Sequence, residues 1–287
     1  MGEEMPMSDE RRTQGAKRPR RSVLFVPGSS AKMLEKARGL RCDVVVLDLE
    51  DAVAPEMKEA ARAQVCAAVG NYGGRETVVR INRLSSPEGK ADLEAVQEAR
   101  PDAILLPKVE GAADIAAARG DLSVWAMIET PKAMLNLSGI AASGAACLLL
   151  GTNDLLKSMR GQALPDRRNL WTVLTETIVA ARAHGLDVID GTYNDISDEE
   201  GFAQACAQGR AFGFDGKTLI HPSQIQAANR IFAPSPDELT QARRILDAFA
   251  QNPGKGALAL DGRMIERLHA EEAQRLLDLA SAIVGRG

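Results

Sequence analysis

The chain has 287 residues, of which 45% are hydrophobic and 26% charged, so its composition is that of a folded globular protein and excludes global disorder. A formal net charge of −4 and an aromatic content of only 3% argue against nucleic acid and anionic membranes as partners. No apolar run reaches the roughly 18 residues of a membrane-spanning helix and no secretory signal opens the chain, so we expect a soluble, cytoplasmic protein whose residues 1–20 form a disordered arm.

From residue 21 onward, short β-branched or leucine-rich runs alternate with longer segments of helical periodicity. The runs predicted as strands are 22–26, 43–47, 77–81, 103–106, 124–128, 147–150, 186–189 and 214–219. The segments predicted as helices are 31–40, 58–69, 92–99, 112–119, 132–142, 168–184, 198–212 and 223–232. Near-continuous apolar strands are typical of a parallel sheet buried on both faces. The pattern therefore predicts an α/β fold, a (β/α)₈ TIM barrel over residues 21–232, with a doubly wound sheet as the alternative.

Two further helices are predicted in a C-terminal helical extension over residues 233–287. Ser235, Pro236 and Glu238 have the pattern of a capping box, which opens a helix that ends near Ala250. A glycine-rich break follows at 252–256, and the last helix is predicted over 264–284. The break and the next few residues indicate a flap that folds over a barrel mouth, either its own or a neighbour's.

In a (β/α)₈ barrel the residues just past the strand ends line the active site. Seven of these ends carry ionisable side chains. They include Asp48, Glu50, Asp51, Arg80, Lys108, Glu129, Asp154, Asp190 and His221. Most are carboxylates, and packing so many acids in one mouth is costly unless a cation is present. Because no cysteine or histidine cluster accompanies them, oxygen ligands indicate Mg²⁺ or Mn²⁺ rather than zinc.

Two basic residues at strand ends admit other chemistry. Lys108 allows a Schiff-base aldolase, but the acids around it are expected to raise the pKa of its ammonium group, which disfavours that reaction. His221, which Pro222 follows, fits a packing or hydrogen-bonding role as well as that of a general base.

Several short motifs follow one another along the chain. They are RSVLFVPG at 21–28, DLEDAV at 48–53, RIN at 80–82, LPK at 106–108, IET at 128–130, GTNDL at 151–155, GFDGK at 213–217 and IHP at 220–222. In this order they resemble the citrate lyase β-subunit-like family of the HpcH/HpaI aldolase superfamily, which includes malyl-CoA and citramalyl-CoA lyases. The resemblance covers residues 20–285.

The resemblance implies roles for the strand-end residues. Glu129 and Asp154 match the two Mg²⁺ ligands of the family, and Arg80 matches the arginine that binds the 2-oxo acid half of the substrate. The remaining polar residues of the mouth are expected to surround the metal, its waters and Arg80. These are Asp48, Glu50, Asp51 and Lys108.

Further matches concern the rest of the substrate. Phe25, Lys32 and Lys36 align with positions that bind coenzyme A, and Ile220 with His221 aligns with a segment that lines the substrate site. Glu266, the last residue of DGRMIE at 261–266, stands where the family has an aspartate that protonates the enolate. In several members that aspartate reaches into a neighbouring subunit.

The activity implied is Mg²⁺-dependent cleavage or formation of a short 3-hydroxyacyl-CoA, of the malyl-CoA, citramalyl-CoA or citryl-CoA type, with acetyl-CoA and a 2-oxo acid as products. The family also implies a homo-oligomer, a trimer or a hexamer. Three alternatives stay open: an acyl-CoA thioesterase on the same site, a metal aldolase for free hydroxy-oxo acids, and a non-catalytic subunit that binds a CoA thioester.

Overall fold

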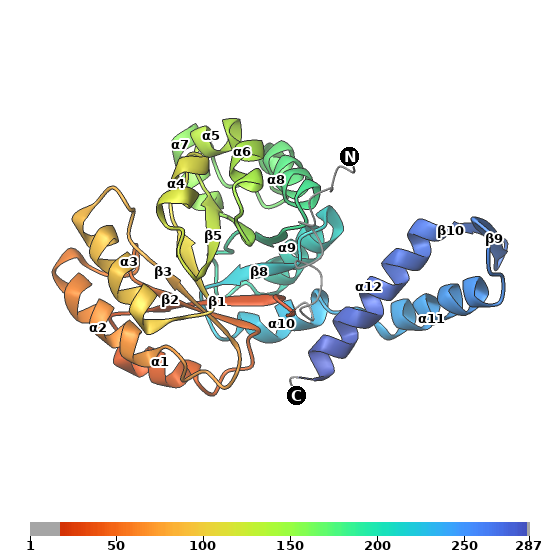
Figure 1. Ribbon diagram of the computed structural model, residues 1–287, viewed down its shortest axis with the longest axis horizontal. Helices are drawn as coiled ribbons and strands as arrows, with labels where there is room; N and C mark the ends of the chain where they lie inside the picture. Colours follow the sequence, from red (N-terminus) through yellow and green to blue (C-terminus); the bar gives the residue numbers. More distant parts are fainter. Residues whose placement is uncertain (1–17, 286–287) are drawn as a thin grey trace, which may run out of the picture. The chain divides into compact units, whose positions relative to one another are not determined.

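The computed structural model describes residues 18–285, so residues 1–17 of the predicted arm lie outside the described part. Eight parallel strands close into a barrel in chain order, and β1 pairs with β8 to complete it (Figure 1). The strands are β1 Ser22–Pro27, β2 Val44–Asp48, β3 Glu76–Arg80, β4 Ala103–Leu106, β5 Ser123–Ile128, β6 Cys147–Leu150, β7 Asp187–Asp190 and β8 Gly216–Leu219. The predicted TIM barrel is confirmed.

Helices connect successive strands and surround the barrel (Figure 1). They are α1 Ala31–Ala37, α2 Lys58–Ala68, α3 Pro87–Ala99, α4 Ala112–Ala117, α5 Pro131–Leu135, α6 Leu137–Ala142, α7 Thr152–Met159, α8 Trp171–Ala183, α9 Glu199–Phe212 and α10 Gln224–Ile231. Short 3₁₀ turns at Pro55–Met57 and Arg168–Leu170 precede α2 and α8.

The helices around the barrel differ from the prediction in three places. α3 begins five residues before the predicted position 92, because Ser86 caps it by accepting a hydrogen bond from the Gly89 N–H at 3.0 Å and Pro87 suits the first turn. The single helix predicted over 132–142 is two, interrupted at Asn136. α7 was not predicted at all, since it is short and its first turn consists of the polar site motif.

The strands are buried on both faces, which explains their continuous apolar runs. Outward-facing residues such as Val45 and Leu47 pack against the helices, whereas Val46, Val78 and Leu105 belong to a second cluster that fills the barrel. Because side chains alternate along each strand, polar residues at the strand ends project over this filled interior.

The amino end of the barrel is sealed by Arg20, which the sequence analysis placed at the end of the arm. Its guanidinium bonds Glu76 at 2.7 and 2.8 Å and Asp187 at 2.6 Å. It also lies 4.7 Å from the ring centroid of Trp125. Arg20 therefore joins the starts of β3 and β7 across a barrel end.

The described chain divides into two compact units, Arg20–Phe232 and a second that contains residues 233–285. In the second unit α11 (Pro236–Ala250) packs on α12 (Arg267–Val284), and between them β9 (Ala257–Leu260) and β10 (Arg263–Glu266) form an antiparallel hairpin. The capping box at Ser235 is confirmed: Ser235 Oγ accepts from the Glu238 N–H at 3.2 Å, and Glu238 Oε2 accepts from the Ser235 N–H at 2.7 Å.

The prediction that the last helix starts at residue 264 is wrong. Asp261 and Gly262 both have positive φ angles, +50° and +74°, which suit the two-residue turn of a β-hairpin. Residues 263–266 therefore pair with β9, and the helix begins only at Arg267. No helix within residues 18–285 is both long enough and apolar enough to cross a membrane.

Candidate active site

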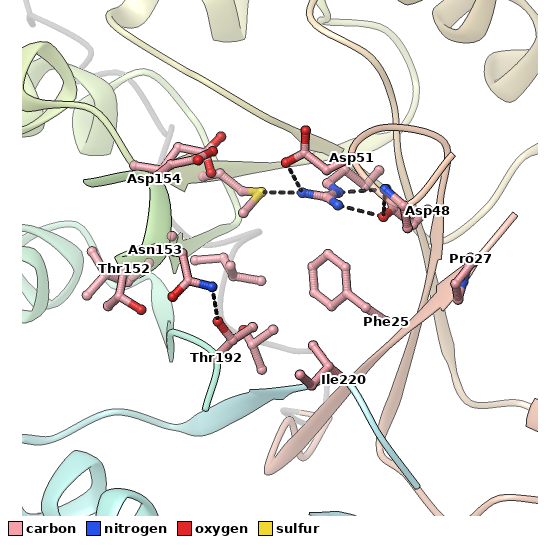
Figure 2. Close-up of a pocket in the computed structure, with 17 residues that line it drawn as sticks. Phe25, Pro27, Asp48, Asp51, Thr152, Asn153, Asp154, Thr192 and Ile220 are labelled. Carbon is pink, nitrogen blue, oxygen red and sulfur yellow. Dashed lines mark hydrogen bonds and ion pairs between the residues drawn. The ribbon is translucent and has the colours of Figure 1, made fainter. Parts of the chain in front are cut away.

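A cavity of about 480 Å³ opens at the carboxyl ends of the barrel strands (Figure 2). Every strand except β4 contributes to its lining, either from its last residues or from the loop that follows. The lining residues are Phe25, Pro27, Asp48, Asp51, Ala52, Arg80, Met127, Glu129, Leu149, Leu150, Gly151, Thr152, Asn153, Asp154, Thr192, Thr218 and Ile220.

Arg80 ends β3, and acids that follow β2 lie beside it, among them Asp48 and Asp51, which Figure 2 labels. Its Nε donates to Asp48 Oδ1 at 2.7 Å and its Nη2 to Asp48 Oδ2 at 2.5 Å. Nη1 lies 2.8 Å from Glu50 Oε2, without hydrogen-bond geometry, and 3.7 Å from Asp51 Oδ2. The Phe25 ring centroid is 5.1 Å from the guanidinium carbon. Asp48 thus fixes one edge of the guanidinium and leaves Nη1 to face the mouth.

Burial and neighbouring charge act in opposite directions on this cluster. Burial disfavours the charge of Arg80, but Asp48 and Glu50 outweigh it and hold the pKa of the guanidinium above its usual range. Burial raises the pKa of Glu50 to about 7, although Arg80 and Lys108 oppose the shift. Arg80 is therefore a permanent cation, whereas Glu50 takes up a proton near neutral pH.

Glu129 follows β5 and Asp154 lies in the first turn of α7. Lys108 donates a hydrogen bond to each of these two carboxylates. The Lys108 backbone N–H donates to Glu129 Oε1 at 2.7 Å, and Lys108 Nζ donates to Asp154 Oδ2 at 2.5 Å. Nζ is also 3.5 Å from Glu129 Oε1 and 3.4 Å from Glu50 Oε1. Although burial opposes it, these acids raise the pKa of Lys108, as the sequence predicted.

Two backbone features, at Lys108 and at Gly151, allow these charged groups to lie close together. Lys108 has a φ of +52°, a left-handed conformation that is unusual for a residue with a side chain and often marks a functional site. At Gly151 any Cβ atom would lie 2.6 Å from Glu129 Oε2, so only glycine leaves room for this carboxylate. Burial, together with the charge of Asp154, raises the pKa of Glu129, although Lys108 opposes the shift.

The donor set fits Mg²⁺. The mouth holds the five carboxylates of Asp48, Glu50, Asp51, Glu129 and Asp154 against two cations, Arg80 and Lys108. Carboxylate oxygens are the ligands that this ion prefers, and a surplus of negative charge favours a divalent cation. Within residues 18–285 no three acid, histidine or cysteine side chains form a complete metal cage. Glu129 and Asp154 would therefore leave positions for water or substrate, as is usual for Mg²⁺.

Other predicted site residues lie in several places. Ile220 lines the cavity, whereas His221 is exposed and its Nδ1 lies 2.8 Å from Ser223 Oγ. Lys32 and Lys36 are exposed on α1, the helix that follows β1.

Phe25 lies inside the barrel end, against Arg80, rather than on its surface (Figure 2). Glu266 belongs to the other compact unit. It caps α12, where its N–H donates to His269 Nδ1 at 3.0 Å.

Sequence reasoning missed several lining residues, chiefly Met127, Leu149, Thr192 and Thr218. Three of them were detectable from the two-residue repeat of a strand. Met127, Leu149 and Thr218 stand two positions before Glu129, Gly151 and Ile220, and so share their face. They form the deeper part of the cavity.

The family of the chain is shown by comparison with known proteins. Residues 21–222 match the model of the HpcH/HpaI aldolase/citrate lyase family, and the chain belongs to this family. It is 47% identical over 273 residues to a (3S)-malyl-CoA thioesterase of Cereibacter sphaeroides, covering 92% of this chain and 96% of that protein. It is 35% identical over 283 residues to the citrate lyase subunit beta of Haemophilus influenzae, covering 92% and 97%.

Solved structures agree with this assignment. The structure of CitE from Mycobacterium tuberculosis in complex with magnesium, acetoacetate and coenzyme A matches with a TM-score of 0.80 and 32% identity, over 92% of this chain and 98% of that one. The citrate lyase beta subunit of the same organism, solved with oxaloacetate and magnesium, matches with a TM-score of 0.70 over 75% of this chain and 98% of that one.

Proposed function

We propose that the protein is a Mg²⁺-dependent carbon–carbon lyase of the cytoplasm. Its substrate would be a short 3-hydroxyacyl-CoA of the malyl-CoA, citramalyl-CoA or citryl-CoA type, and its products acetyl-CoA and a 2-oxo acid. The observation that carries this proposal is that Arg80, Glu129 and Asp154 all line one cavity. The family and the ligands named for the CitE structures support it.

Glu129 and Asp154 would hold the Mg²⁺, for which Mn²⁺ is a chemically similar substitute. When bound, the ion supplies Lewis acidity to the oxygens of the 2-oxo acid. Arg80 would bind the carboxylate of that acid through Nη1, the nitrogen that Asp48 does not bond and that lies 2.8 Å from Glu50 Oε2 and 3.9 Å from Met127 Sδ. Asp48, Glu50 and Asp51 fix the direction of the guanidinium, and Lys108 keeps the two ligand carboxylates in place.

The reaction is a retro-aldol cleavage. The 3-hydroxyl proton passes to a carboxylate of the mouth, the bond between C2 and C3 breaks, and its electron pair moves to the thioester carbonyl as an enolate. Protonation at C2 then gives the acetyl thioester. We propose Glu266 as that proton donor, from its own or a neighbouring subunit of a homo-oligomer.

The coenzyme A part of the substrate is assigned to the first βα unit. Lys32 and Lys36 stand four residues apart on one exposed face of α1, where two cations suit the phosphates of coenzyme A. Phe25, which lines the cavity beside Arg80, would contact the part of coenzyme A next to the thioester. Ile220, which also lines the cavity, and His221, the next residue, would border the acyl chain.

A second candidate is hydrolysis of the thioester on the same site. It is favoured by the name (3S)-malyl-CoA thioesterase of relatives that are 47% identical. In this reaction water adds to the same carbonyl carbon, and the products are a free hydroxy acid and coenzyme A.

One experiment distinguishes the two activities: malyl-CoA, citramalyl-CoA and citryl-CoA are each incubated with the protein and Mg²⁺, and the products are identified. A lyase releases a 2-oxo acid and acetyl-CoA, whereas a thioesterase releases free coenzyme A and no 2-oxo acid.

Glu266→Gln is expected to lower cleavage by about 10²–10⁴-fold, the usual effect of losing a positioned acid. Lys32→Glu with Lys36→Glu should raise KM in a salt-dependent way. Absence of turnover with all three thioesters would contradict the proposal and favour a free-acid aldolase or a non-catalytic subunit.

A further inference from the structure

One hydroxyl group at the cavity has no explanation in the protein itself. Thr218, on β8, is 3% exposed and lines the cavity. Within residues 18–285 its Oγ1 has no hydrogen-bond partner. Another buried threonine, Thr177 on α8, shows the ordinary arrangement, since its Oγ1 donates to the Val173 carbonyl at 2.8 Å. The Thr218 hydroxyl therefore differs from that of Thr177 in having no partner among the described residues.

Packing does not require this hydroxyl. Thr218 pairs in register with Val23 of β1, whose side chain lies in the apolar interior of the barrel. Valine has the same shape as threonine and would avoid burying an unpaired polar group, which is unfavourable. On the other side, Asp190 pairs with Lys217, so the next residue, Gly191, lies beside Thr218 and offers no side chain. Because Thr218 lines the cavity, a molecule bound there could supply the missing partner.

We propose that the Thr218 hydroxyl donates a hydrogen bond to the carbonyl oxygen of the bound thioester, an inference that rests on the proposed function. The charged groups Arg80, Glu129 and Asp154 come from the ends of β3, β5 and β6 and are suited to a carboxylate and a metal. Thr218 comes from β8, which pairs with β1, and β1 is the strand that leads into α1 with its two lysines. Ile220, which follows β8, lies across the cavity from Asp154 (Figure 2). A neutral hydroxyl at this end suits a neutral carbonyl.

This assignment serves cleavage and hydrolysis equally. In cleavage the electron pair of the bond between C2 and C3 moves to the thioester oxygen, and in hydrolysis the addition of water to the carbonyl carbon moves the π electrons there. In both cases the oxygen gains negative charge, so a hydrogen bond from Thr218 becomes charge-assisted and stronger in the transition state. Loss of the hydroxyl should therefore lower kcat more than it raises KM.

The test uses the isosteric variant Thr218→Val, with Thr218→Ser to restore the hydroxyl and Thr177→Val as the matched control. Turnover of malyl-CoA with Mg²⁺, binding of acetyl-CoA, binding of pyruvate with Mg²⁺, and the thermal midpoint are measured for each. Thr218→Val should lower kcat/KM by about 10–10²-fold and weaken acetyl-CoA binding, whereas Thr218→Ser stays within about threefold of the parent. Pyruvate, which has no thioester, should bind as before, and the thermal midpoint should not fall. Thr177→Val should show the reverse, a lower midpoint with unchanged kcat/KM.

Two results would overturn the inference. One is a Thr218→Val protein with parental kcat/KM and acetyl-CoA affinity. The other is a loss of pyruvate affinity with unchanged acetyl-CoA affinity, which would place the hydroxyl against the 2-oxo acid. If the parent protein acts on no CoA thioester, the proposed function fails, and acetyl-CoA binding by the two Thr218 variants still decides the present inference.

Discussion

The two ends of the barrel contain the same arrangement of an arginine, two carboxylates and an aromatic ring. At the carboxyl end Arg80 contacts Asp48 and Glu50 and lies 5.1 Å from the Phe25 ring. At the amino end Arg20 contacts Glu76 and Asp187 and lies 4.7 Å from the Trp125 ring. Since buried ion pairs of this kind occur at both ends, such a pair does not by itself identify an active site.

What distinguishes the two ends is the surplus of charge and the space around it. At the amino end Arg20 satisfies its two acids, and the side chains of Arg20 and Glu76 are 15% and 5% exposed. At the carboxyl end three more acids, Asp51, Glu129 and Asp154, lie near Arg80 and its partners. Among the described residues that pair with these three acids, Lys108 is the only cation besides Arg80. There the residues also border a cavity. The amino end is therefore built for stability, whereas the carboxyl end retains unbalanced charge that a metal and a substrate can use.

The largest effect is expected from Glu129→Gln, which keeps the shape of the side chain but removes its charge. Losing one of two carboxylate ligands should abolish Mg²⁺ binding and lower turnover by about 10³-fold or more, because the ion contributes several kcal/mol to the transition state. Calorimetric titration with Mg²⁺ and a turnover assay measure the two effects. Full turnover of the parent protein in excess chelator would falsify the metal requirement.

The matching change at the amino end is Arg20→Met. It leaves Glu76 and Asp187 buried without their cation, so the free energy of unfolding should fall by about 3–5 kcal/mol. The kcat per folded molecule should not change, since Arg20 lies at the opposite end from the cavity. Denaturant unfolding and turnover at low temperature check both statements. Arg38→Met, at an exposed pair with Glu35, is the control and should cost less than about 1 kcal/mol. A changed kcat in Arg20→Met would show that the two ends are coupled.

At the mouth, Arg80→Lys keeps the positive charge but loses the planar set of donors that both Asp48 and a carboxylate require. We expect kcat to fall by about 10²–10³-fold, as for loss of one donor to a developing oxyanion, with a smaller loss of stability than in Arg20→Met. Arg83→Lys, at an exposed arginine 3.5 Å from Glu110, is the matched control. Near-parental kcat in Arg80→Lys would make the role of Arg80 purely structural, like that of Arg20.

The sequence predicted the barrel and most of the mouth because both depend on local patterns. A strand buried on both faces must be apolar throughout, and the polar residue that ends it marks the mouth. This logic located Arg80, Glu129 and Asp154. It did not reveal the ion pairs at the amino end of the barrel. Arg20 precedes the first predicted strand, and its partners Glu76 and Asp187 lie more than 50 positions away from it in the sequence.

Other features depend on details that a strand or helix pattern does not contain. The positive φ of Lys108, which lets its N–H reach Glu129, is a property of the closed barrel rather than of the sequence LPK. The hairpin before α12 follows from the turn at Asp261 and Gly262, a signal present in the sequence but interpreted only as part of a flap. Thr218 was hidden inside the short strand GKTL, where its side chain looks like ordinary β-branched packing.

The smallest effect concerns Glu50, which distinguishes the mouth from the amino end by its response to pH. Burial raises its pKa from 4.5 to about 7, so the folded protein holds a proton on Glu50 that the unfolded chain has already released. This contribution to stability is fully present below pH 4.5 and is lost as the pH rises through about 7, by at most roughly 3 kcal/mol. Glu50→Gln, which is neutral at every pH, should therefore gain stability relative to the parent between pH 5 and pH 7.5. Denaturant unfolding at both pH values, in chelator, measures the difference, and Glu56→Gln provides a control for loss of an exposed carboxylate. A stability difference between Glu50→Gln and the parent that does not vary with pH would contradict this role of burial and would make Glu50 a simple ionic partner of Arg80, as Glu76 is of Arg20.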